Sequence, residues 1–357
     1  MRSDPFSPLR QWGWSSFKLC ADIVFAATPP YDGTLARYYR LPADLAYPLP
    51  ENLTLEDGAM VISIRSSGLV LICHTQMEPL SVGVHSVANL GGFRSGQSIA
   101  IFGCGPVGLL CMAVAKALGA QRIIAVDIVP QRLEFAKSYA ATETYLPPKP
   151  LEGETKLDYS KRNAEQMKKQ LNIQDRGINK VDLVIDASGA EVSIQTALYI
   201  VGTGGTFVQV CNGIFPLNHS LIAFVKVGMG APNVTVNIGL LMVKELNYKG
   251  SFRYGVCCLH LCLSVTYWSW TKPGDYSLAI SLVANEKVDL KPLVTHRWEL
   301  FKYDLVGSCI KSFQRYAFKD AIAAFKATRF GKSADGRGVI KAIISGPEWP
   351  PTWEIVE

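Results

Sequence analysis

The sequence predicts an α/β protein whose main domain is a doubly wound parallel sheet. Short apolar segments with strand character alternate with segments of helical pattern along the chain. Strands that alternate with helices in this way are typical of parallel sheets. The segments expected to be strands are 98–102, 122–127, 181–189, 204–209 and 246–254. At 357 residues, 48% of them hydrophobic, the chain is long enough for two domains with sizeable cores.

A glycine-rich turn directly follows the first of these strands. Ser98-Ile-Ala-Ile-Phe runs into Gly103-Cys-Gly-Pro-Val-Gly108, which opens a helix closed by Gly119. In a dinucleotide-binding turn the first glycine permits the tight bend, the second lets the backbone approach the pyrophosphate, and the third lets helix and strand pack closely. The helix N-terminus then faces the phosphate charge. We therefore expect Gly103, Gly105 and Gly108 to bind a dinucleotide in a Rossmann domain.

An acidic residue closes the second strand. Asp127 follows Arg122-Ile-Ile-Ala-Val, where a carboxylate accepts a hydrogen bond from the ribose 2′-hydroxyl and repels a 2′-phosphate. The position of Asp127 therefore predicts NAD as the cofactor. Arg132 keeps NADP open, because a nearby arginine can accept the 2′-phosphate.

The composition disfavours other classes of protein. The net charge is +6, but the basic residues form no long run, so we expect no nucleic-acid partner. The Lys- and Glu-rich stretch 150–178 is expected to be a surface helix rather than a binding arm. No stretch reaches the roughly 18 apolar residues that a membrane helix needs, and residues 1–14 lack a signal-peptide core. The expectation is a cytoplasmic protein with its cysteines as thiols and no membrane contact.

Several segments resemble the zinc-dependent polyol dehydrogenases of the medium-chain dehydrogenase/reductase superfamily, and within it the fungal xylitol dehydrogenases. The resemblance covers about residues 20–347, with breaks. The segments that carry it are CADIVFAATPPYDGTLARYY (20–39), EPLSVGVHS (78–86), GCGPVGLL (103–110), DASGAEVSIQTA (186–197), KGSFRYG (249–255), KPLVTHR (291–297) and FKATRFGKSADGRGVIKAIISGP (325–347).

This resemblance implies an activity and a domain plan. The activity is NAD-linked interconversion of xylitol and D-xylulose, in which zinc activates the hydroxyl and hydride passes to the nicotinamide. Sorbitol or L-arabinitol as the substrate stays an alternative. Residues 1–85 would be the remnant of a GroES-like catalytic domain, 86–290 the NAD-binding domain, and 291–357 the return to the catalytic domain. Relatives form homotetramers, so a homo-oligomer is expected.

The same resemblance implies catalytic residues. Glu78 would lie at the zinc ion or its bound water, or contact substrate, although a carboxylate before Pro79 can also simply begin a helix. Arg253 and Tyr254 would lie between cofactor and polyol, with a surface arginine and a packing tyrosine as the alternative. Phe25 and Thr28 match positions on the substrate side.

Further residues match cofactor contacts of the family. Besides the three glycines, these residues are Val107, Asp127, Arg132, the run Val227, Gly228 and Met229, and the run Ser251, Phe252 and Arg253. His85 and His296 are expected to be structural rather than catalytic.

The chain departs from the family at its zinc sites. The family's catalytic Cys and His-Glu pair have no counterpart in residues 1–19. Cys20 matches only the last of the four cysteines that hold a structural zinc ion, and one cysteine cannot hold that ion. We therefore expect the chain as printed to be inactive, and a catalytically inactive NAD-binding protein is the alternative function.

Four segments interrupt the resemblance, at 61–76, 210–226, 256–272 and about 298–315. They are 16 to 18 residues long, and three begin with valine, whose codons begin GT. We interpret them as retained introns, with coding insertions as the alternative. Their cysteines and histidines, such as those of 257–262, are therefore not expected to bind metal.

Overall fold

The computed structural model describes residues 50–53, 77–210, 233–251 and 274–293, and the backbone alone of 296–299 and 342–345. Of Met77 and Glu78 the backbone alone is likewise described. The chain divides into two compact units. The larger unit contains all described residues up to Asp289, and the smaller unit contains those from Leu290 onward.

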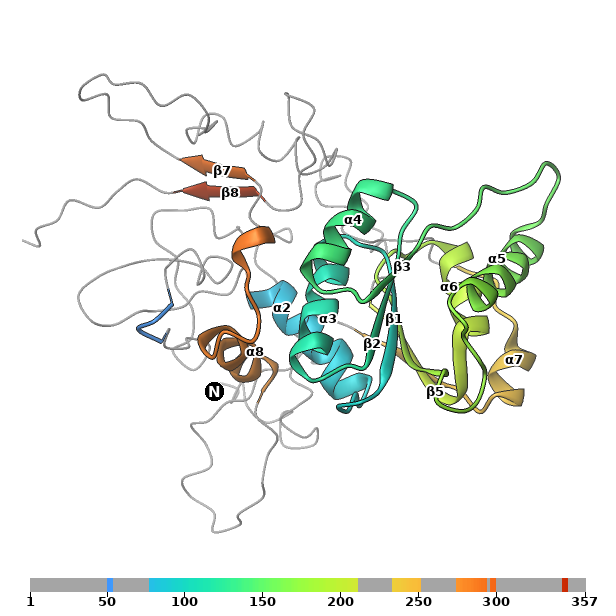
Figure 1. Ribbon diagram of the computed structural model, residues 1–357, viewed down its shortest axis with the longest axis horizontal. Coiled ribbons are helices and arrows are strands. Elements are labelled where there is room, and N and C mark those ends of the chain that lie inside the picture. The colour runs from blue at the N-terminus through green and yellow to red at the C-terminus, as the bar shows by residue number, and fades with distance from the viewer. Residues whose placement is uncertain are drawn as a thin grey trace, which may run out of the picture. The chain divides into compact units, whose positions relative to one another are not determined.

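The larger unit is built on a six-stranded sheet whose strands are all parallel, in the order β3-β2-β1-β4-β5-β6 (Figure 1). The strands are β1 (Ser98–Phe102), β2 (Arg122–Val126), β3 (Glu143–Tyr145), β4 (Val181–Asp186), β5 (Val201–Gln209) and β6 (Asn247–Gly250). This arrangement confirms the predicted doubly wound sheet. The strand order reverses beside β1, and a ligand crevice in such sheets opens at that point, at the carboxyl ends of the strands.

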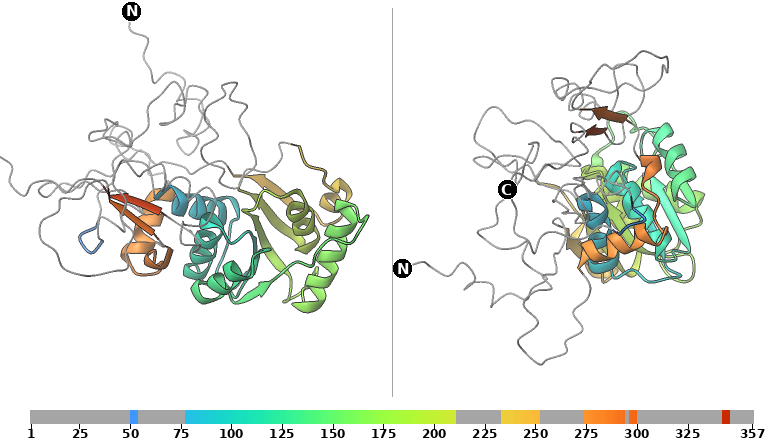
Figure 2. Two further views of the ribbon diagram at one scale, coloured as in Figure 1. Left: turned by 90° about the horizontal axis from the view of Figure 1, so that it is seen from above. Right: turned by 90° about the vertical axis from the view of Figure 1, so that its left-hand side faces the viewer.

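Helices cover both faces of the sheet (Figures 1 and 2). The helices that connect or flank the strands are α3 (Pro106–Ala117), α4 (Pro130–Tyr139), α5 (Lys156–Gln170), α6 (Glu191–Ile200) and α7 (Ile238–Val243). Alternate residues of β1 and β2, such as Phe102 and Val126, join Met167 of α5 and Ala197 of α6 in one fully buried cluster. Ile101 points to the other face, toward α3. The near-continuous apolar strands therefore reflect burial on both faces.

A second group of helices packs around α2 (Met77–Val84), which also contacts α3. α2 continues directly into the π-helix η4 (His85–Leu90) and packs against α8 (Asp275–Ala284). His85 is buried, and its Nδ1 lies 2.9 Å from Oδ2 of Asp275 at the start of α8. The expectation that His85 is a structural helix residue agrees with this position.

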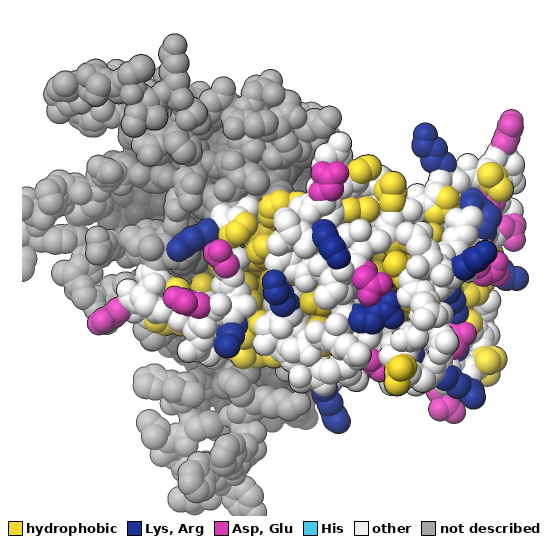
Figure 3. Space-filling view, viewed as in Figure 1, with side chains coloured by type: hydrophobic (Ala, Val, Ile, Leu, Met, Phe, Trp, Pro, Cys, Tyr) yellow, Lys and Arg dark blue, Asp and Glu magenta, His cyan; other side chains and the backbone are white. Residues whose placement is uncertain are grey.

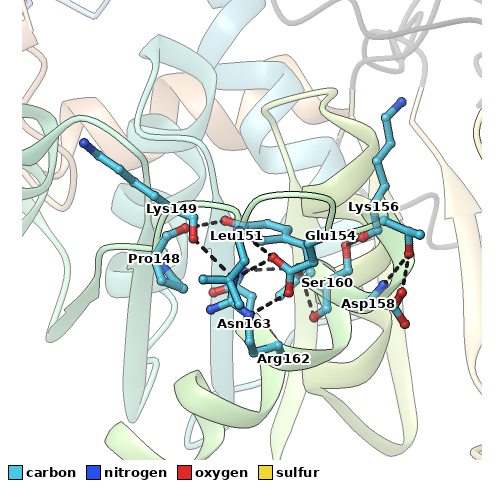
Figure 4. Close-up of polar contacts among 12 residues, drawn as sticks. Pro148, Lys149, Leu151, Glu154, Lys156, Asp158, Ser160, Arg162 and Asn163 are labelled. Atoms are coloured by element: carbon cyan, nitrogen blue, oxygen red, sulfur yellow. Dashed lines mark hydrogen bonds and ion pairs between the residues drawn. The ribbon is translucent and has the colours of Figure 1, made fainter.

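The predicted surface helix is α5, which Thr155 caps by accepting a hydrogen bond from the Asp158 N–H. The loop before it is fixed by polar contacts (Figure 4). Glu154 makes a bidentate ion pair with Arg162, at 2.7 Å for both bonds, and also accepts the Leu151 N–H at 2.9 Å. This loop follows the carboxyl end of β3 and is therefore held close to α5.

The described part of the smaller unit contains the 3₁₀ helix η6 (Lys291–Leu293) and a two-stranded parallel sheet of β7 (His296–Glu299) and β8 (Ala342–Ser345). His296 begins β7, and its role stays a prediction. β7 runs two residues beyond Arg297, into the expected fourth insertion. The other insertions lie outside the described residues, apart from Val210, and so does Cys20.

Candidate dinucleotide site

The glycine-rich turn connects the end of β1 to the first turn of α3. Gly103 has φ +98°, a conformation that residues with a Cβ rarely adopt, and a Cβ on Gly108 would lie 1.8 Å from the Gly103 carbonyl oxygen. The fold itself therefore requires these two glycines. Gly105 differs, because it has extended backbone and a Cβ there would meet no atom of the described residues within 4 Å. Open space above Gly105 is what the approach of a pyrophosphate needs.

The first turn of α3 leaves backbone N–H groups directed at the same space. Pro106 occupies the first helical position, and Leu109 is the first residue whose N–H bonds back to Gly105, at 2.9 Å. No acidic side chain lies in this first turn. Val107 is half-buried there. The helix end can therefore accept a phosphate without electrostatic repulsion from its own side chains.

Asp127 follows β2 and lies beside the glycine turn. Its residue exposure is 8%, its Oδ2 accepts the Cys104 N–H at 2.7 Å, and its Oδ1 accepts the Val129 N–H at 2.9 Å. Arg132 Nη1 lies 3.9 Å from Oδ2, and the Arg132 side chain is half exposed. The structure thus brings Asp127 and Arg132 together with the three glycines. The contact from Cys104 links the acid directly to the turn.

The Cys104 thiol is buried within this turn. Burial raises its pKa to about 12, with the nearby Asp127 carboxylate adding to the rise. A thiol held in its neutral form is a poor nucleophile and a poor metal ligand. Cys104 therefore packs as a small apolar residue in the turn.

Several expected site residues lie outside the described residues. Phe25, Thr28, Val227, Gly228, Met229, Phe252, Arg253 and Tyr254 belong to this group. Ser251 is described and half-buried; it donates its N–H to the Gln209 carbonyl at 2.7 Å, and its Oγ lies 3.1 Å from Ser86 Oγ in η4. Glu78 is the second residue of α2, so it does begin a helix, and its side chain is not described. The roles assigned to these residues stay predictions.

No cluster of His, Cys, Asp and Glu side chains suited to a metal ion occurs within the described residues. The described residues therefore fit a dinucleotide but do not by themselves fit a zinc ion.

Sequence reasoning did not single out Asp186 as a site residue. Asp186 closes β4 at the same edge of the sheet, is fully buried, and accepts hydrogen bonds from the turn that follows. The signal was available, because an acid ends this apolar strand just as Asp127 follows β2. The small residues after it, Ala187-Ser-Gly189, were expected to end the strand 181–189, but β4 ends at Asp186 and these residues form the turn that follows.

Comparison with known proteins identifies the family. The zinc-binding dehydrogenase family matches residues 106–261. The D-xylulose reductase A of Aspergillus niger is 41% identical over 330 residues, covering 92% of this chain and 68% of that protein. The D-xylulose reductase A of Aspergillus oryzae is 40% identical with the same coverage.

Solved structures share the fold. Galactitol-1-phosphate dehydrogenase from Escherichia coli superposes with a TM-score of 0.57 at 24% identity, over 84% of this chain and 67% of that chain. L-idonate 5-dehydrogenase from Escherichia coli gives a TM-score of 0.61 at 20% identity, over 96% and 72%. These likenesses agree with the parallel sheet and its glycine turn. By its identity to the Aspergillus proteins, the chain belongs to the zinc-binding dehydrogenases, the family of the fungal D-xylulose reductases.

Proposed function

We propose that this protein is an NAD-dependent polyol dehydrogenase that interconverts xylitol and D-xylulose. The observation that carries the proposal is the 41% identity to a D-xylulose reductase over 92% of the chain. The geometry of the glycine turn supports the dinucleotide part of it. Residues 86–290 are the proposed NAD-binding domain, between catalytic-domain segments 1–85 and 291–357.

NAD, when bound, supplies the acceptor for the hydride that leaves the alcohol carbon. Gly105 and the N-terminus of α3 would receive the pyrophosphate. Asp127 would accept the hydroxyls of the adenosine ribose and repel a 2′-phosphate, which supports NAD over NADP. Arg253 and Tyr254 are proposed to contact the polyol, with Phe25 and Thr28 on the substrate side and Glu78 at the zinc ion that the family binds.

We also propose that the protein acts in the cytoplasm on a small-molecule substrate, without nucleic acid. Among the described residues, no helix is long and apolar enough to cross a membrane. On the described part of the face in Figure 3, Lys and Arg side chains are interspersed with Asp and Glu. The described part of this face therefore has no continuous basic patch of the kind that binds nucleic acid.

Self-association is a further part of the proposal. β6 lies at the edge of the sheet formed by the described strands, and its four residues are all exposed. Tyr248 on this strand is 40% exposed, and Met242 and Val243 of α7 are 73% and 81% exposed. An exposed edge flanked by apolar side chains is a surface that a second copy can cover.

The test expresses the product of the mature transcript and, in parallel, the 357-residue chain. NADH and NADPH binding are measured by fluorescence, and turnover of xylitol, sorbitol and L-arabinitol is followed by NADH formation. We expect the transcript product to oxidise xylitol fastest and to prefer NAD. Faster turnover of sorbitol or L-arabinitol would favour the alternative substrates, and NADH binding without any turnover would favour the inactive NAD-binding protein. A preference for NADP would show that Asp127 does not select the cofactor.

A further inference from the structure

One buried carboxylate lies at the centre of the sheet's carboxyl edge. Asp186 is the last residue of β4 and is fully buried. It pairs in register with Phe102, the last residue of β1, which directly precedes Gly103. Asp186 therefore lies next to the glycine turn, on the side of β1 away from Asp127.

Four donors converge on this carboxylate. Its Oδ1 accepts the Ser188 hydroxyl at 2.7 Å and the Ser188 N–H at 3.3 Å. Its Oδ2 accepts the Gly189 N–H at 3.0 Å and the Gln209 side-chain amide at 2.6 Å. Burial raises the pKa of Asp186, and these hydrogen bonds oppose that rise. An ionised carboxylate only accepts, so its chemistry matches a set made entirely of donors.

The segment held by Asp186 packs against the glycine turn. The Ala187 N–H donates to the Phe102 carbonyl at 2.8 Å. A Cβ on Gly103 would lie 3.0 Å from the Ser188 nitrogen, so the two turns are in direct contact. Gln209 extends the connection to β6, because its carbonyl accepts the Ser251 N–H at 2.7 Å. The carboxylate thus bonds directly to the turn after β4 and to Gln209 at the end of β5, and backbone hydrogen bonds of Ala187 and Gln209 continue the connection to the end of β1 and to Ser251.

A dinucleotide lies across such an edge with its two halves on opposite sides of the first strand. Asp127, beside β1 on the β2 side, belongs to the adenosine half. The Asp186 turn, on the β4 side, therefore faces the other half.

We propose that Asp186 is a positioning residue for the nicotinamide half of the dinucleotide. It holds Ser188 and Gly189 against the glycine turn, and these residues form the surface under the nicotinamide half. The carboxylate keeps that surface in shape but does not itself contact the dinucleotide. This role rests on the proposed function.

The experiment compares binding of NADH with binding of AMP, which contains the adenosine half alone, in the 357-residue chain. In Asp186→Asn the new side-chain NH₂ group replaces one carboxylate oxygen. It then faces a hydrogen-bond donor, so the turn at Ser188 and Gly189 loses an acceptor. We expect NADH to bind about tenfold more weakly, as a lost charge-assisted hydrogen bond predicts, and AMP to bind within about twofold of the unaltered chain. Ser188→Ala keeps the buried carboxylate and removes one donor, so it should weaken NADH binding by about threefold.

A matched control comes from the other end of the same strand. Asp182 Oδ2 accepts the Ser98 N–H at 3.0 Å, far along β4 from the turn. Asp182→Asn makes the same chemical change, and we expect it to lower the unfolding temperature without changing NADH binding.

Equal weakening of NADH and AMP binding by Asp186→Asn would reduce the residue to a structural role and overturn the inference. Unchanged NADH binding in the Ser188→Ala variant would do the same, and this variant decides the question if Asp186→Asn does not fold. If the unaltered chain binds AMP but not NADH, or binds neither, the proposed cofactor itself is wrong. That failure is seen in the unaltered chain alone, before any variant is compared, and so is distinct from failure of the inference about Asp186.

Discussion

At the scale of single residues, the three glycines of the turn have different tasks. Gly103 and Gly108 are required by the fold, since one has φ +98° and the other has no room for a Cβ. At Gly105 no described residue demands a glycine, so the requirement there is proposed to come from the ligand. Substitution by alanine should separate these tasks.

Gly105→Ala should leave the unfolding temperature unchanged and weaken NADH binding about tenfold or more, because the new methyl group occupies the space for the pyrophosphate. Gly108→Ala should instead lower the unfolding free energy by about 2 kcal/mol, because a methyl group is forced against the Gly103 carbonyl. Thermal unfolding and NADH titration of both variants check this pair. A destabilised Gly105→Ala protein would mean that the space above Gly105 is filled by the chain itself.

The Cys104 thiol should be inert in the folded protein, since burial holds its pKa at about 12. At pH 8 almost none of it is thiolate, and the thiolate is the reactive form. We expect iodoacetamide to leave the Cys104 peptide unmodified in native protein and to alkylate it after denaturation, as measured by mass spectrometry. Modification of native Cys104 at the rate of a free thiol would contradict its burial.

At the scale of elements, the strands could be predicted wherever a run of apolar residues is buried on both faces. β3 was not predicted, because Glu143-Thr-Tyr145 is too short to show a pattern. The π-helix η4 was not predicted either, since a change from one helical hydrogen-bond pattern to another leaves no mark in the spacing of apolar residues. Of the expected strand 246–254, only Asn247–Gly250 forms β6; Leu246 and Ser251 lie outside the strand, and residues 252–254 lie outside the described residues.

The loop before α5 should weaken in acid. The Arg162 side chain and the Leu151 N–H lower the pKa of Glu154 from its ordinary 4.5 to about 2. A carboxyl whose pKa is lowered in the folded state contributes stability above its unfolded pKa and loses that contribution as the pH falls through its folded pKa. Glu154→Gln should therefore flatten the fall of the unfolding temperature between pH 4.5 and pH 2. Glu152→Gln, two residues away in the same loop and exposed, is the control. An equal effect of the two variants would exclude a specific role of the Arg162 pair.

The exposed edge at β6 should mediate association. Tyr248→Lys places a charge on the edge strand, where it would oppose addition of a second strand. We expect this variant to sediment at a lower mass than the unaltered chain in analytical ultracentrifugation. Leu151→Lys alters another apolar side chain, 61% exposed in the loop before α5, and should leave the mass unchanged. If the unaltered chain is itself monomeric, the proposed association through β6 is wrong.

At the scale of the whole molecule, the sequence predicted the sheet, the glycine turn and its acid, because each depends on neighbours within one βαβ unit. It could not show the hydrogen bond from the Cys104 N–H to Asp127, because that bond depends on the backbone geometry of the turn. It also could not show the packing of the Asp186 turn against Gly103, because that packing depends on β1 and β4, distant in sequence, pairing side by side. The substrate side of the site rests on resemblance, since most of its expected residues lie outside the described part of the chain.

The 357 residues expressed by themselves should bind NADH but contain no stoichiometric zinc and oxidise no xylitol. The reason is that the Cys and His-Glu ligands implied by the resemblance have no counterpart in residues 1–19. Elemental analysis of the purified chain and a xylitol assay with added zinc check this. Zinc-dependent oxidation by these residues alone would show that other side chains can hold the metal.

The central position of β1 and β4 determines which part of the larger unit unfolds last. Both strands have a neighbour on each side, and Ile101 and Ile185 are fully buried. Amide protons in such strands exchange with solvent only when the whole domain unfolds. The Gly103 turn and Asp186 lie at the ends of these two strands, so the candidate dinucleotide site is built on strands whose amide protons are expected to exchange most slowly among the described residues. Limited proteolysis should accordingly remove peripheral segments before it abolishes dinucleotide binding.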